Sequence, residues 1–372
     1  MHQVNILSEK GFRVSVACCQ KPGSLKRPEE LVPAIEELII SRDFGVQRRL
    51  VGRLIAVWQW HRRVRGIIRR LRPDIVIAHD AEGAFAVGNM PHRVGARMIW
   101  HFHHNPDRLH RGGSVGMANR YAYRNARQAD LITNCDAMRA QVFAKEASID
   151  ANSIIVVPNC TRSIPAVPPP NLREALDSAI PQGAAIVMYH GAIGPDHGLE
   201  VAVRSLPQWP RNSVFVLKGK AHADFADRIK GLASSLGVSS RVIFYDPGFQ
   251  PFDEHYAAIA SADIGWTVFE PVHVNWKYQA MGSNKRFECM ALGVPQIADD
   301  NPGAVEFIQE QGFGLCIPWN SPEAAAKAVN RLLGDDAFRK SVAQHCRELH
   351  LNRYNYDAQF KPVVEWIERG TR

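Results

Sequence analysis

The sequence lacks the features that would direct it to a membrane-spanning, secreted or fibrous class. No apolar run is long enough to cross a bilayer, and stretches such as 180–189 are short and broken. The N-terminal residues show no basic segment followed by an apolar one, so we expect no secretory signal peptide. Hydrophobic residues make up 46% and charged residues 22% of the chain, which excludes disordered, collagen-like and coiled-coil proteins. Because 372 residues exceed what one hydrophobic core usually holds, we expect two domains.

Cysteine is scarce and irregularly placed. The chain has seven cysteines, an odd number, and no CxxC or paired Cys/His spacing. This pattern argues against a disulfide framework and against a structural zinc site. With no export signal, a reducing cytoplasm is the expected location.

Positive charge, in contrast, is in excess. The formal net charge is +8 and the isoelectric point is about 9.2, which indicates an anionic partner without naming it. Between Arg48 and Arg72, arginines alternate with an apolar stripe at helical spacing, so an amphipathic helix with a cationic face is predicted. The arginines expected to face an anionic surface are Arg62, Arg63, Arg65, Arg69 and Arg70.

Three interpretations of this helix stay open. It could be an ordinary surface helix, or it could attach the protein to the anionic inner face of the cell membrane, where each basic residue contributes on the order of 1 kcal/mol. Nucleic-acid binding also draws on basic surfaces, but no nucleic-acid motif or aromatic platform accompanies the helix. We therefore expect no nucleic-acid partner and favour the membrane surface for the charge excess.

Short apolar runs alternate with helical segments along most of the chain. This alternation predicts parallel sheets covered by helices, in two βα-repeating domains. A proline-rich segment, 163–183, predicts a linker between a domain at 1–162 and a domain at 184–355. The tail 356–372 predicts a final amphipathic helix, with the first domain as its candidate partner.

The first domain does not begin as a doubly wound domain usually does, with a strand and a glycine-containing turn. Residues 4–10 predict the end of a helix, and residues 11–17 predict what would be the second strand. The opening strand of the usual pattern is therefore the missing element of this prediction.

The second half of the chain contains a run that resembles a known family. Residues 282–298 read GSNKRFECMALGVPQIA, which is similar to the segment PNKlfEymaaGvPvia of the family 4 glycosyltransferases. YHGAIG at 189–194 and GFGLC at 312–316 follow the order of the family, and the match covers about residues 186–333. RPDIVIAHD at 72–80 and IWHFHH at 99–104 match more loosely. The resemblance implies an α/β GT-B fold, in which two Rossmann-like doubly wound domains face each other across a cleft.

The residues predicted to bind a nucleotide-sugar donor lie at strand ends and at the start of a helix. Ser283 and Asn284 precede a helix whose free N–H groups and dipole favour phosphate, and Lys285 adds a point charge. Glu288 lies one turn further, where a carboxylate can accept both ribose hydroxyls. The full set is Gly191, Gly194, His197, Lys218, Ser283, Asn284, Lys285 and Glu288.

Three positions depart from the pattern of the family. The first glutamate of its usual pair would fall at Ala280, and its phosphate-binding arginine and lysine would fall at Ala192 and His197. His197 and Lys218 could contact phosphate or simply face solvent. Lys285 is the candidate to compensate for these losses.

The first domain supplies two candidate catalytic residues. The family places a histidine that contacts the donor sugar after the strand that corresponds to the IWHFHH segment at 99–104. His103 matches that position best. Asp80, at a strand end, could touch the acceptor or cap a helix. The cluster at 101–104 could suggest a metal, since imidazole is a common ligand. No carboxylate completes a recognisable site, however, and the resemblance implies metal-independent chemistry, so no metal and no other cofactor is expected.

The resemblance implies transfer of a sugar, with retention at the anomeric carbon, to a glycan or lipid-linked acceptor in cell-surface polysaccharide synthesis. The protein would act in the cytoplasm, with the membrane surface as its possible site of attachment. Two alternatives remain: a nucleotide-sugar 2-epimerase with the same fold, and a non-catalytic protein that binds a nucleotide sugar or acts as a scaffold.

Overall fold

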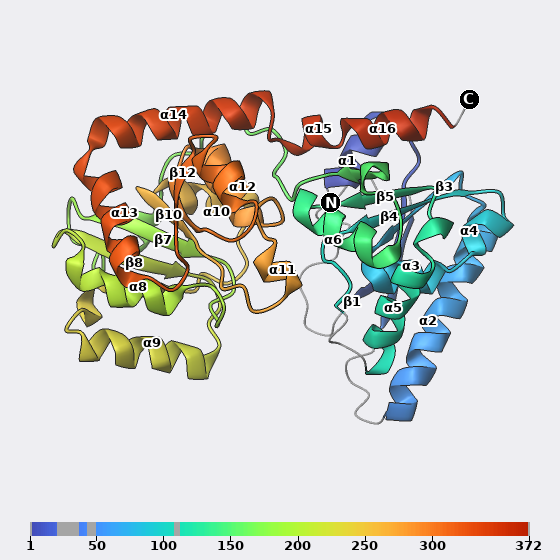
Figure 1. Cartoon of the computed structure of the whole chain (residues 1–372), viewed down its shortest axis with the longest axis horizontal. Helices are drawn as coiled ribbons and strands as arrows, with labels where there is room; N and C mark the ends of the chain where they lie inside the picture. Colours follow the sequence, from blue (N-terminus) through green and yellow to red (C-terminus); the bar gives the residue numbers. More distant parts are fainter. Residues whose placement is uncertain (1, 21–36, 43–49, 108–111, 371–372) are drawn as a thin grey trace. The chain divides into compact units, whose positions relative to one another are not determined.

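A computed structural model describes residues 2–20, 37–42, 50–107 and 112–370 of the chain. The chain divides into two compact units, one of residues 1–157 with 359–372 and one of residues 158–358 (Figure 1). Each unit combines parallel strands with helices, as the alternating pattern predicts. The α/β class and the two Rossmann-like domains expected from the sequence are confirmed.

The second unit contains a six-stranded parallel sheet in the order β12-β11-β10-β7-β8-β9. Its strands are β7 (Ala185–His190), β8 (Ser213–Lys218), β9 (Val242–Tyr245), β10 (Ile264–Thr267), β11 (Gln296–Asp299) and β12 (Gly314–Ile317). Its longer helices are α8 (Leu199–Ser205), α9 (Ala223–Ser235), α10 (Phe252–Ala260), α12 (Asn284–Leu292), α13 (Pro322–Gly334) and α14 (Asp336–Asn352). The short elements are α7 (Leu172–Ala175), α11 (Val274–Lys277), α15 (Tyr356–Gln359) and a π-helical turn at Val305–Gln309.

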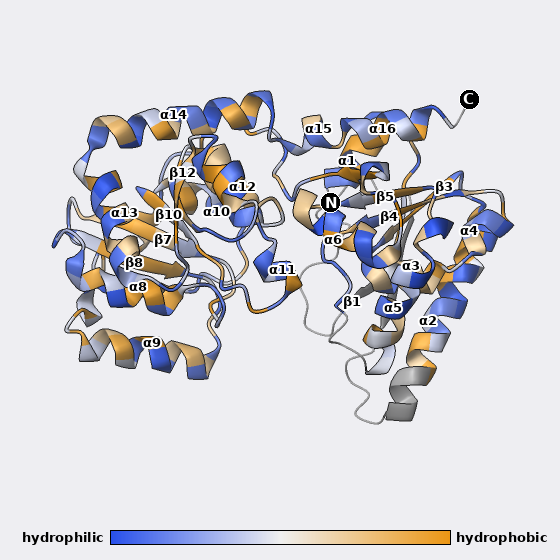
Figure 2. Cartoon of the chain, viewed as in Figure 1, coloured by the Kyte–Doolittle hydropathy of each residue, from blue (hydrophilic) through white to orange (hydrophobic). Residues whose placement is uncertain are grey.

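Helices cover both faces of this sheet. Because successive side chains of a strand point to opposite faces, each strand contributes side chains to both buried faces. In β7, Val187 and Tyr189 join a core that includes residues of α8, α9 and α13, while Ile186 and Met188 join a core that includes residues of α10 and α12. The strands are largely orange in Figure 2, and the covering helices alternate between blue and orange. The sheet is therefore fixed from both sides, and its carboxyl edge is a rigid platform for side chains.

The first unit contains a four-stranded parallel sheet in the order β3-β4-β5-β6 and a separate parallel pair, β1 and β2. Its strands are β1 (Ser15–Gln20), β2 (Glu37–Arg42), β3 (Ile75–His79), β4 (Arg97–Phe102), β5 (Leu131–Asn134) and β6 (Ile154–Val156). Its helices are α1 (His2–Glu9), α2 (Leu50–Leu71), α3 (Asp80–Val87), α4 (Met90–Arg93), α5 (Gly113–Arg124), α6 (Ala137–Ala147) and α16 (Lys361–Glu368). The first described element is thus a helix followed by a strand, as the sequence predicts, whereas β2 was not predicted.

The C-terminal tail contributes to the first unit. The predicted single helix is two helices, α15 and α16, and Pro362 lies in the first turn of α16. The Arg97 guanidinium lies 3.4 Å from the centroid of the Trp366 ring and donates a hydrogen bond to the Trp366 carbonyl at 2.9 Å. Cation–π stacking and a hydrogen bond to the helix end together hold α16 beside β4.

The structure draws the boundary between the units elsewhere than the predicted linker. Residues 163–183 belong to the second unit, which begins at Pro158. Leu172 and Ile180 of this segment are buried in the core on the α10 and α12 side of the sheet. Proline and polar residues indicated a linker, but the few apolar side chains among them anchor the segment to the domain that follows.

Helix α2 carries the arginines singled out in the sequence. Val64 and Ile68 are buried against the first unit, and the exposed side includes Ile55 and Trp58, which are 50% and 58% exposed. Arg48 and Arg49 of the predicted helix lie outside the described residues. Among the helices that the structure describes, none has both the length and the apolar character that a bilayer crossing needs.

A buried ion pair fastens α12 to the ends of β10 and β11. Arg286 and Asp299 have fully buried side chains and form a hydrogen-bonded ion pair. Arg286 also donates to the carbonyls of Thr267 at 3.2 Å, Gln279 at 2.9 Å and Ala280 at 3.3 Å. These bonds offset the cost of removing the guanidinium from water and fix the helix against two strand ends.

We expect Asp299→Asn to lower the free energy of unfolding by about 3–5 kcal/mol, because it leaves a buried guanidinium without its counter-charge. Asp300→Asn is the matched control, since the neighbouring side chain is exposed. Urea unfolding followed by circular dichroism measures both. Equal stability of the two variants would contradict this role for the pair.

Candidate functional site

The carboxyl edge of the second sheet brings most of the predicted donor-binding residues together. The Gly191 N–H, after β7, donates to the carbonyl of Lys218 at the end of β8 at 2.9 Å. The Lys218 side chain reaches His255 on α10, which in turn faces Glu288 on α12. Lys285 lies against Gly191. This is the edge where ligands bind in open α/β sheets.

Glu288 is the centre of a hydrogen-bonded network. Its Oε2 accepts from His190 Nε2 at 2.8 Å, and its Oε1 lies 3.7 Å from His255 Nε2. Lys218 Nζ lies 2.9 Å from His255 Nδ1 and can only donate, so the His255 Nε2–H points at the carboxylate. Burial by itself would raise the pKa of Glu288, but the hydrogen bond from His190 and the attraction of the nearby His255 outweigh it and hold the pKa well below its usual range. The carboxylate is therefore ionised and held from two sides.

Lys285 places its ammonium beside the glycine turn. Its ammonium lies 5.1 Å from the ring centroid of Tyr189 and 5.6 Å from that of Phe269, positions that favour cation–π attraction. Burial lowers the pKa of Lys285 to about 8, against the opposing effect of Glu288. Gly191 has φ +122°, and a Cβ there would lie 2.8 Å from Lys285 Cε. Glycine is thus required both by the backbone and by the lysine beside it.

His197 is placed differently from a phosphate-binding cation. Its ring centroid lies 5.4 Å from Tyr189, 5.6 Å from Phe269 and 5.4 Å from Trp276, and its Nδ1 lies 2.7 Å from the Pro195 carbonyl. Burial, reinforced by the charge of Lys285, lowers the pKa of His197 to about 4. An uncharged ring packed among aromatic side chains can shape a pocket wall, but it supplies no positive charge at neutral pH.

The other predicted positions differ in their exposure. Gly194 is buried, and a Cβ there would lie 3.0 Å from the His222 ring, so its missing side chain makes room for that ring. Ser283 is buried and caps α12 without a side-chain hydrogen bond to any described residue, whereas Asn284 is exposed. The first N–H groups of α12 therefore remain available to a ligand.

Asn159 was not predicted as a site residue, although it lies in the sequence motif VPN. Its backbone N–H donates to the Met281 carbonyl at 3.2 Å and its side-chain amide donates to the Gly282 carbonyl at 2.8 Å. These bonds hold the segment that leads into α12. A motif far away in the sequence thus supports the turn that presents Ser283.

In the first unit, the predicted residues Asp80 and His103 lie side by side. Asp80 Oδ1 accepts from the backbone N–H of His103 at 2.8 Å and of His104 at 3.1 Å. On the other side, Arg139 Nη1 donates to the His103 carbonyl at 2.8 Å. Asp80 has φ +55°, a sparsely populated conformation for a residue with a side chain. The backbone N–H and the carbonyl of His103 are thus both hydrogen-bonded. The Asp80 side chain holds this loop and does not cap α3.

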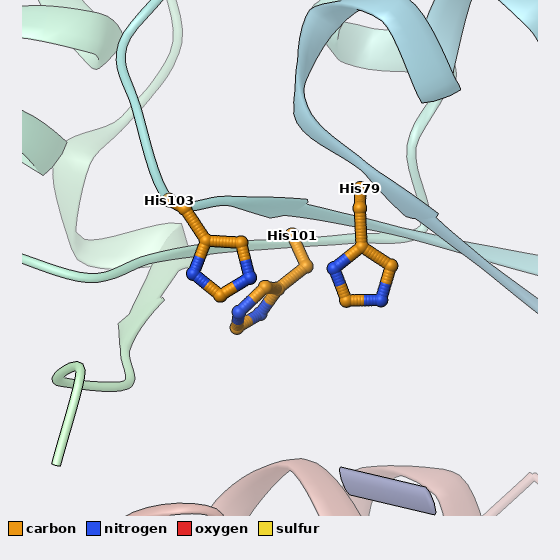
Figure 3. Close-up of side chains that lie close together, drawn as sticks. All are labelled: His79, His101 and His103. Atoms are coloured by element: carbon orange, nitrogen blue, oxygen red, sulfur yellow. The ribbon is translucent and has the colours of Figure 1, made fainter. Parts of the chain in front are cut away.

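Three histidine rings meet beside this loop. His79 ends β3, His101 pairs with it on β4, and His103 follows β4 (Figure 3). The ring centroids of His101 lie 5.2 Å from His79 and 4.6 Å from His103. Burial, together with the two neighbouring rings, holds the pKa of His101 well below its usual range.

Sequence reasoning identified part of this arrangement. The glycine turn, Lys285 and Glu288 follow from the resemblance, and the described structure places them at one edge. His255 lies on a helix with no distinguishing spacing, and no signal in the sequence links it to Glu288. His79 lies in the segment RPDIVIAHD at 72–80. A parallel pairing of β3 with β4 was the signal that could have placed it beside His101.

Comparison with known families agrees with these features. The sequence profile described as "Glycosyl transferase 4-like domain" matches residues 1–160, and the profile "Glycosyl transferases group 1" matches residues 173–349. The chain is 23% identical to the lipopolysaccharide core biosynthesis glycosyltransferase LpsE of Rhizobium meliloti, over 96% of this chain and 91% of that protein. It is 27% identical to a D-inositol 3-phosphate glycosyltransferase of Corynebacterium urealyticum, over 63% of this chain and 55% of that one.

Several curated relatives match over only part of their sequence, and the chain spans about half of their length. The structure is also similar to that of Anabaena Alr3699/HepE, solved in complex with UDP and glucose. The TM-score is 0.73 with 16% identity, over 99% of this chain and 95% of that one. At this identity the likeness shows the fold.

We expect acid to destabilise the protein partly through His190, whose side chain is 3% exposed. Burial lowers its pKa despite Glu288, so below about pH 6.5 the unfolded chain takes up a proton that the folded chain refuses, and stability is lost as the pH falls. In His190→Gln the amide nitrogen can take the place of Nε2 but does not titrate. The variant should lose less stability on acidification, by up to about 1.4 kcal/mol per pH unit for one proton. Urea unfolding between pH 7.5 and 5.5 measures this; identical pH dependence in both proteins would contradict it.

Proposed function

Since the chain belongs to the group 1 glycosyltransferases and has their GT-B fold, we propose that it transfers a sugar from a nucleoside-diphosphate sugar to a hydroxyl group of an acceptor. The observation that carries the proposal is the carboxyl edge of the second sheet. There a cation, Lys285, and an ionised carboxylate, Glu288, lie on one helix beside a glycine turn. These groups suit the diphosphate and the ribose of a nucleotide.

The diphosphate would meet Lys285 and the first N–H groups of α12. Both stabilise the negative charge that builds on the leaving group as the bond to the sugar breaks. The family's phosphate-binding arginine and lysine are replaced here by Ala192, which has no cationic side chain, and by His197, which is uncharged. Lys285 therefore carries more of the charge stabilisation than either residue of that arginine–lysine pair would. The Lys218 side chain is directed at His255, so in this proposal it orients that histidine.

The ribose would bind at Glu288. His190 holds Oε2 at 2.8 Å, whereas the contact between Oε1 and His255 is long, at 3.7 Å. Two ribose hydroxyls can therefore approach Oε1 while His190 keeps the carboxylate oriented. In this proposal His190 and His255 are positioning residues, and Glu288 is the residue that touches the ribose of the donor.

His103 would contact the donor sugar, and Asp80 would position the loop that carries His103. The carboxylate of Asp80 is engaged by two backbone N–H groups of the His103 loop, so its contribution to the reaction comes through the position of that loop. Retention at the anomeric carbon follows from membership of the family and not from a nucleophile in the described residues.

Transfer in this proposal needs no metal ion. Lys285 and the N–H groups at the start of α12 would neutralise the diphosphate in place of a divalent cation. We place the reaction in the cytoplasm, which agrees with the free thiols of the cysteines whose side chains are described.

The acceptor in our proposal is a glycan or lipid-linked sugar of a cell-surface polysaccharide. The support is the relative LpsE, named for lipopolysaccharide core biosynthesis, because the match spans nearly the full length of both chains. An acceptor carried on a lipid would lie at a membrane surface, where the basic helix α2 could bind.

Helix α2 would attach the protein to an anionic membrane surface. Arg62, Arg63, Arg69 and Arg70 are exposed, and the exposed Trp58 lies beneath the Arg62 guanidinium at 5.4 Å. Arg65 differs from these four, because it donates to the Ala86 and Phe85 carbonyls at the end of α3. Arg65 therefore serves the first unit, whereas the side chains of the four others are exposed to solvent.

The test of the proposed function is nucleotide binding and turnover. We expect UDP- or GDP-sugars to raise the melting temperature, and Glu288→Ala to weaken the nucleotide by roughly 10- to 150-fold, the equivalent of 1.5–3 kcal/mol for hydrogen bonds to a charged group. Glu310→Ala, at an exposed position, is the matched control. Calorimetric titration measures both. Absence of binding by any nucleotide sugar would contradict the proposal, and conversion of the donor without an acceptor would indicate an epimerase.

The membrane proposal is tested by flotation with vesicles. We expect the wild-type chain to float with anionic phosphatidylglycerol vesicles and not with neutral phosphatidylcholine, and replacement of the four exposed arginines by glutamine to abolish flotation, since each contributes about 1 kcal/mol. The variant with four lysines keeps the charge and should float. Equal flotation on neutral and anionic vesicles would contradict membrane attachment through charge.

A further inference from the structure

The three histidine rings at the carboxyl edge of the first sheet form a compact group. One ring nitrogen from each of His79, His101 and His103 lies within 4.8 Å of the corresponding nitrogens of the other two. Figure 3 shows the rings of His79 and His103 side by side, with nitrogens turned toward each other and with the His101 ring below them. Two of the three side chains are held by directly paired strands, so the group is fixed by the sheet.

His101 has a nitrogen that the described protein leaves unsatisfied. Its Nδ1 lies 2.5 Å from Thr133 Oγ1 on β5, and its Nε2 is buried with no hydrogen-bond partner among the described residues. The residue is 1% exposed. A buried polar atom without a partner is costly, at about 1–3 kcal/mol. When Nδ1 donates to Thr133, Nε2 presents a lone pair, which is how a metal-binding imidazole is oriented.

The second unit offers an instructive comparison. His190, His255 and Glu288 are also close enough together to hold an ion. There, however, the carboxylate accepts from His190, and Lys218 binds His255, so the group is satisfied by its own members. Only the group in the first unit has a buried imidazole nitrogen that lacks a partner among the described residues.

We propose that His79, His101 and His103 bind a transition-metal ion such as Zn²⁺, with a fourth coordination position open to water. Three imidazole ligands with one open position are a known zinc arrangement, and imidazole also suits Cu, Ni and Fe ions. Bonds of about 2.0–2.1 Å in a tetrahedron place the nitrogens about 3.4 Å apart, so the rings need to turn inward by a small amount. His79 is exposed and His103 half-buried, which leaves the ion a path from solvent.

This site differs from the expectation drawn from the sequence, where His101, His103 and His104 suggested no complete metal site. The structure adds His79 from the neighbouring strand and directs Asp80 to the backbone of the loop. The binding of the ion does not depend on the proposed function. Its effect does: because His103 is the residue proposed to touch the donor sugar, a bound ion would occupy its ring and inhibit transfer.

The experiment is a titration of the chain, purified without a histidine tag, with Co²⁺, whose visible absorption reports tetrahedral coordination. We expect one Co²⁺ per chain, displaced by Zn²⁺. His79→Ala should weaken binding at least tenfold, and Thr133→Val, which preserves volume, by about 10- to 100-fold through the loss of the bond to His101. His255→Ala removes the other group and is the matched control, with binding unchanged.

Each outcome decides the proposal. Absence of Co²⁺ binding by the wild type, or full binding by His79→Ala, overturns it, and loss of binding in His255→Ala with retention in His79→Ala assigns the ion to the second unit instead. Inhibition is read separately: Zn²⁺ should suppress sugar transfer by the wild type, reversibly with a chelator, and should not suppress it in His79→Ala. A chain that binds Co²⁺ but transfers no sugar would refute the proposed function and leave the metal site standing.

Discussion

The buried pair of Arg286 and Asp299 fixes the geometry on which the donor edge depends. Arg286 lies between Lys285 and Glu288 on α12, and its guanidinium is bonded to the ends of β10 and β11. A helix of nine residues has little stability of its own. The pair compensates by bonding the helix to the rigid edge of a sheet that is buried on both faces. Where Lys285 and Glu288 project is therefore decided by the residue between them.

Both units place histidines at the carboxyl ends of their strands, but the surroundings give the rings opposite properties. In the second unit a carboxylate and a lysine are within reach, so the imidazoles become donors that orient Glu288. In the first unit the nearby carboxylate of Asp80 is directed at backbone N–H groups, and the rings face one another. The same side chain thus serves as a positioning donor in one unit and as a candidate metal ligand in the other.

Much of the fold could be predicted from local patterns. Ile186–Tyr189 is an apolar run typical of a strand buried on both faces, and it lies within β7. The segment 163–183 shows where local composition was misleading: its prolines suggested a linker, but burial of Leu172 and Ile180 attaches it to the second unit. Strand β2 was not predicted, although it contains the short apolar run at 38–40; its parallel pairing with β1 is seen only in the structure.

The sequence by itself determined the family, the two-domain α/β class, and the presence of a glycine turn, a lysine and a glutamate in the order that a nucleotide-sugar site requires. These properties are written in local patterns, since periodicity and motif spacing need only neighbours along the chain. Tertiary structure alone decided that His190 and His255 hold Glu288, that His197 is uncharged, and that His79 joins His101 and His103. Each of these depends on residues from different strands and helices, and on the burial that follows when they are packed together, which is the physical reason that spacing in the sequence did not reveal them.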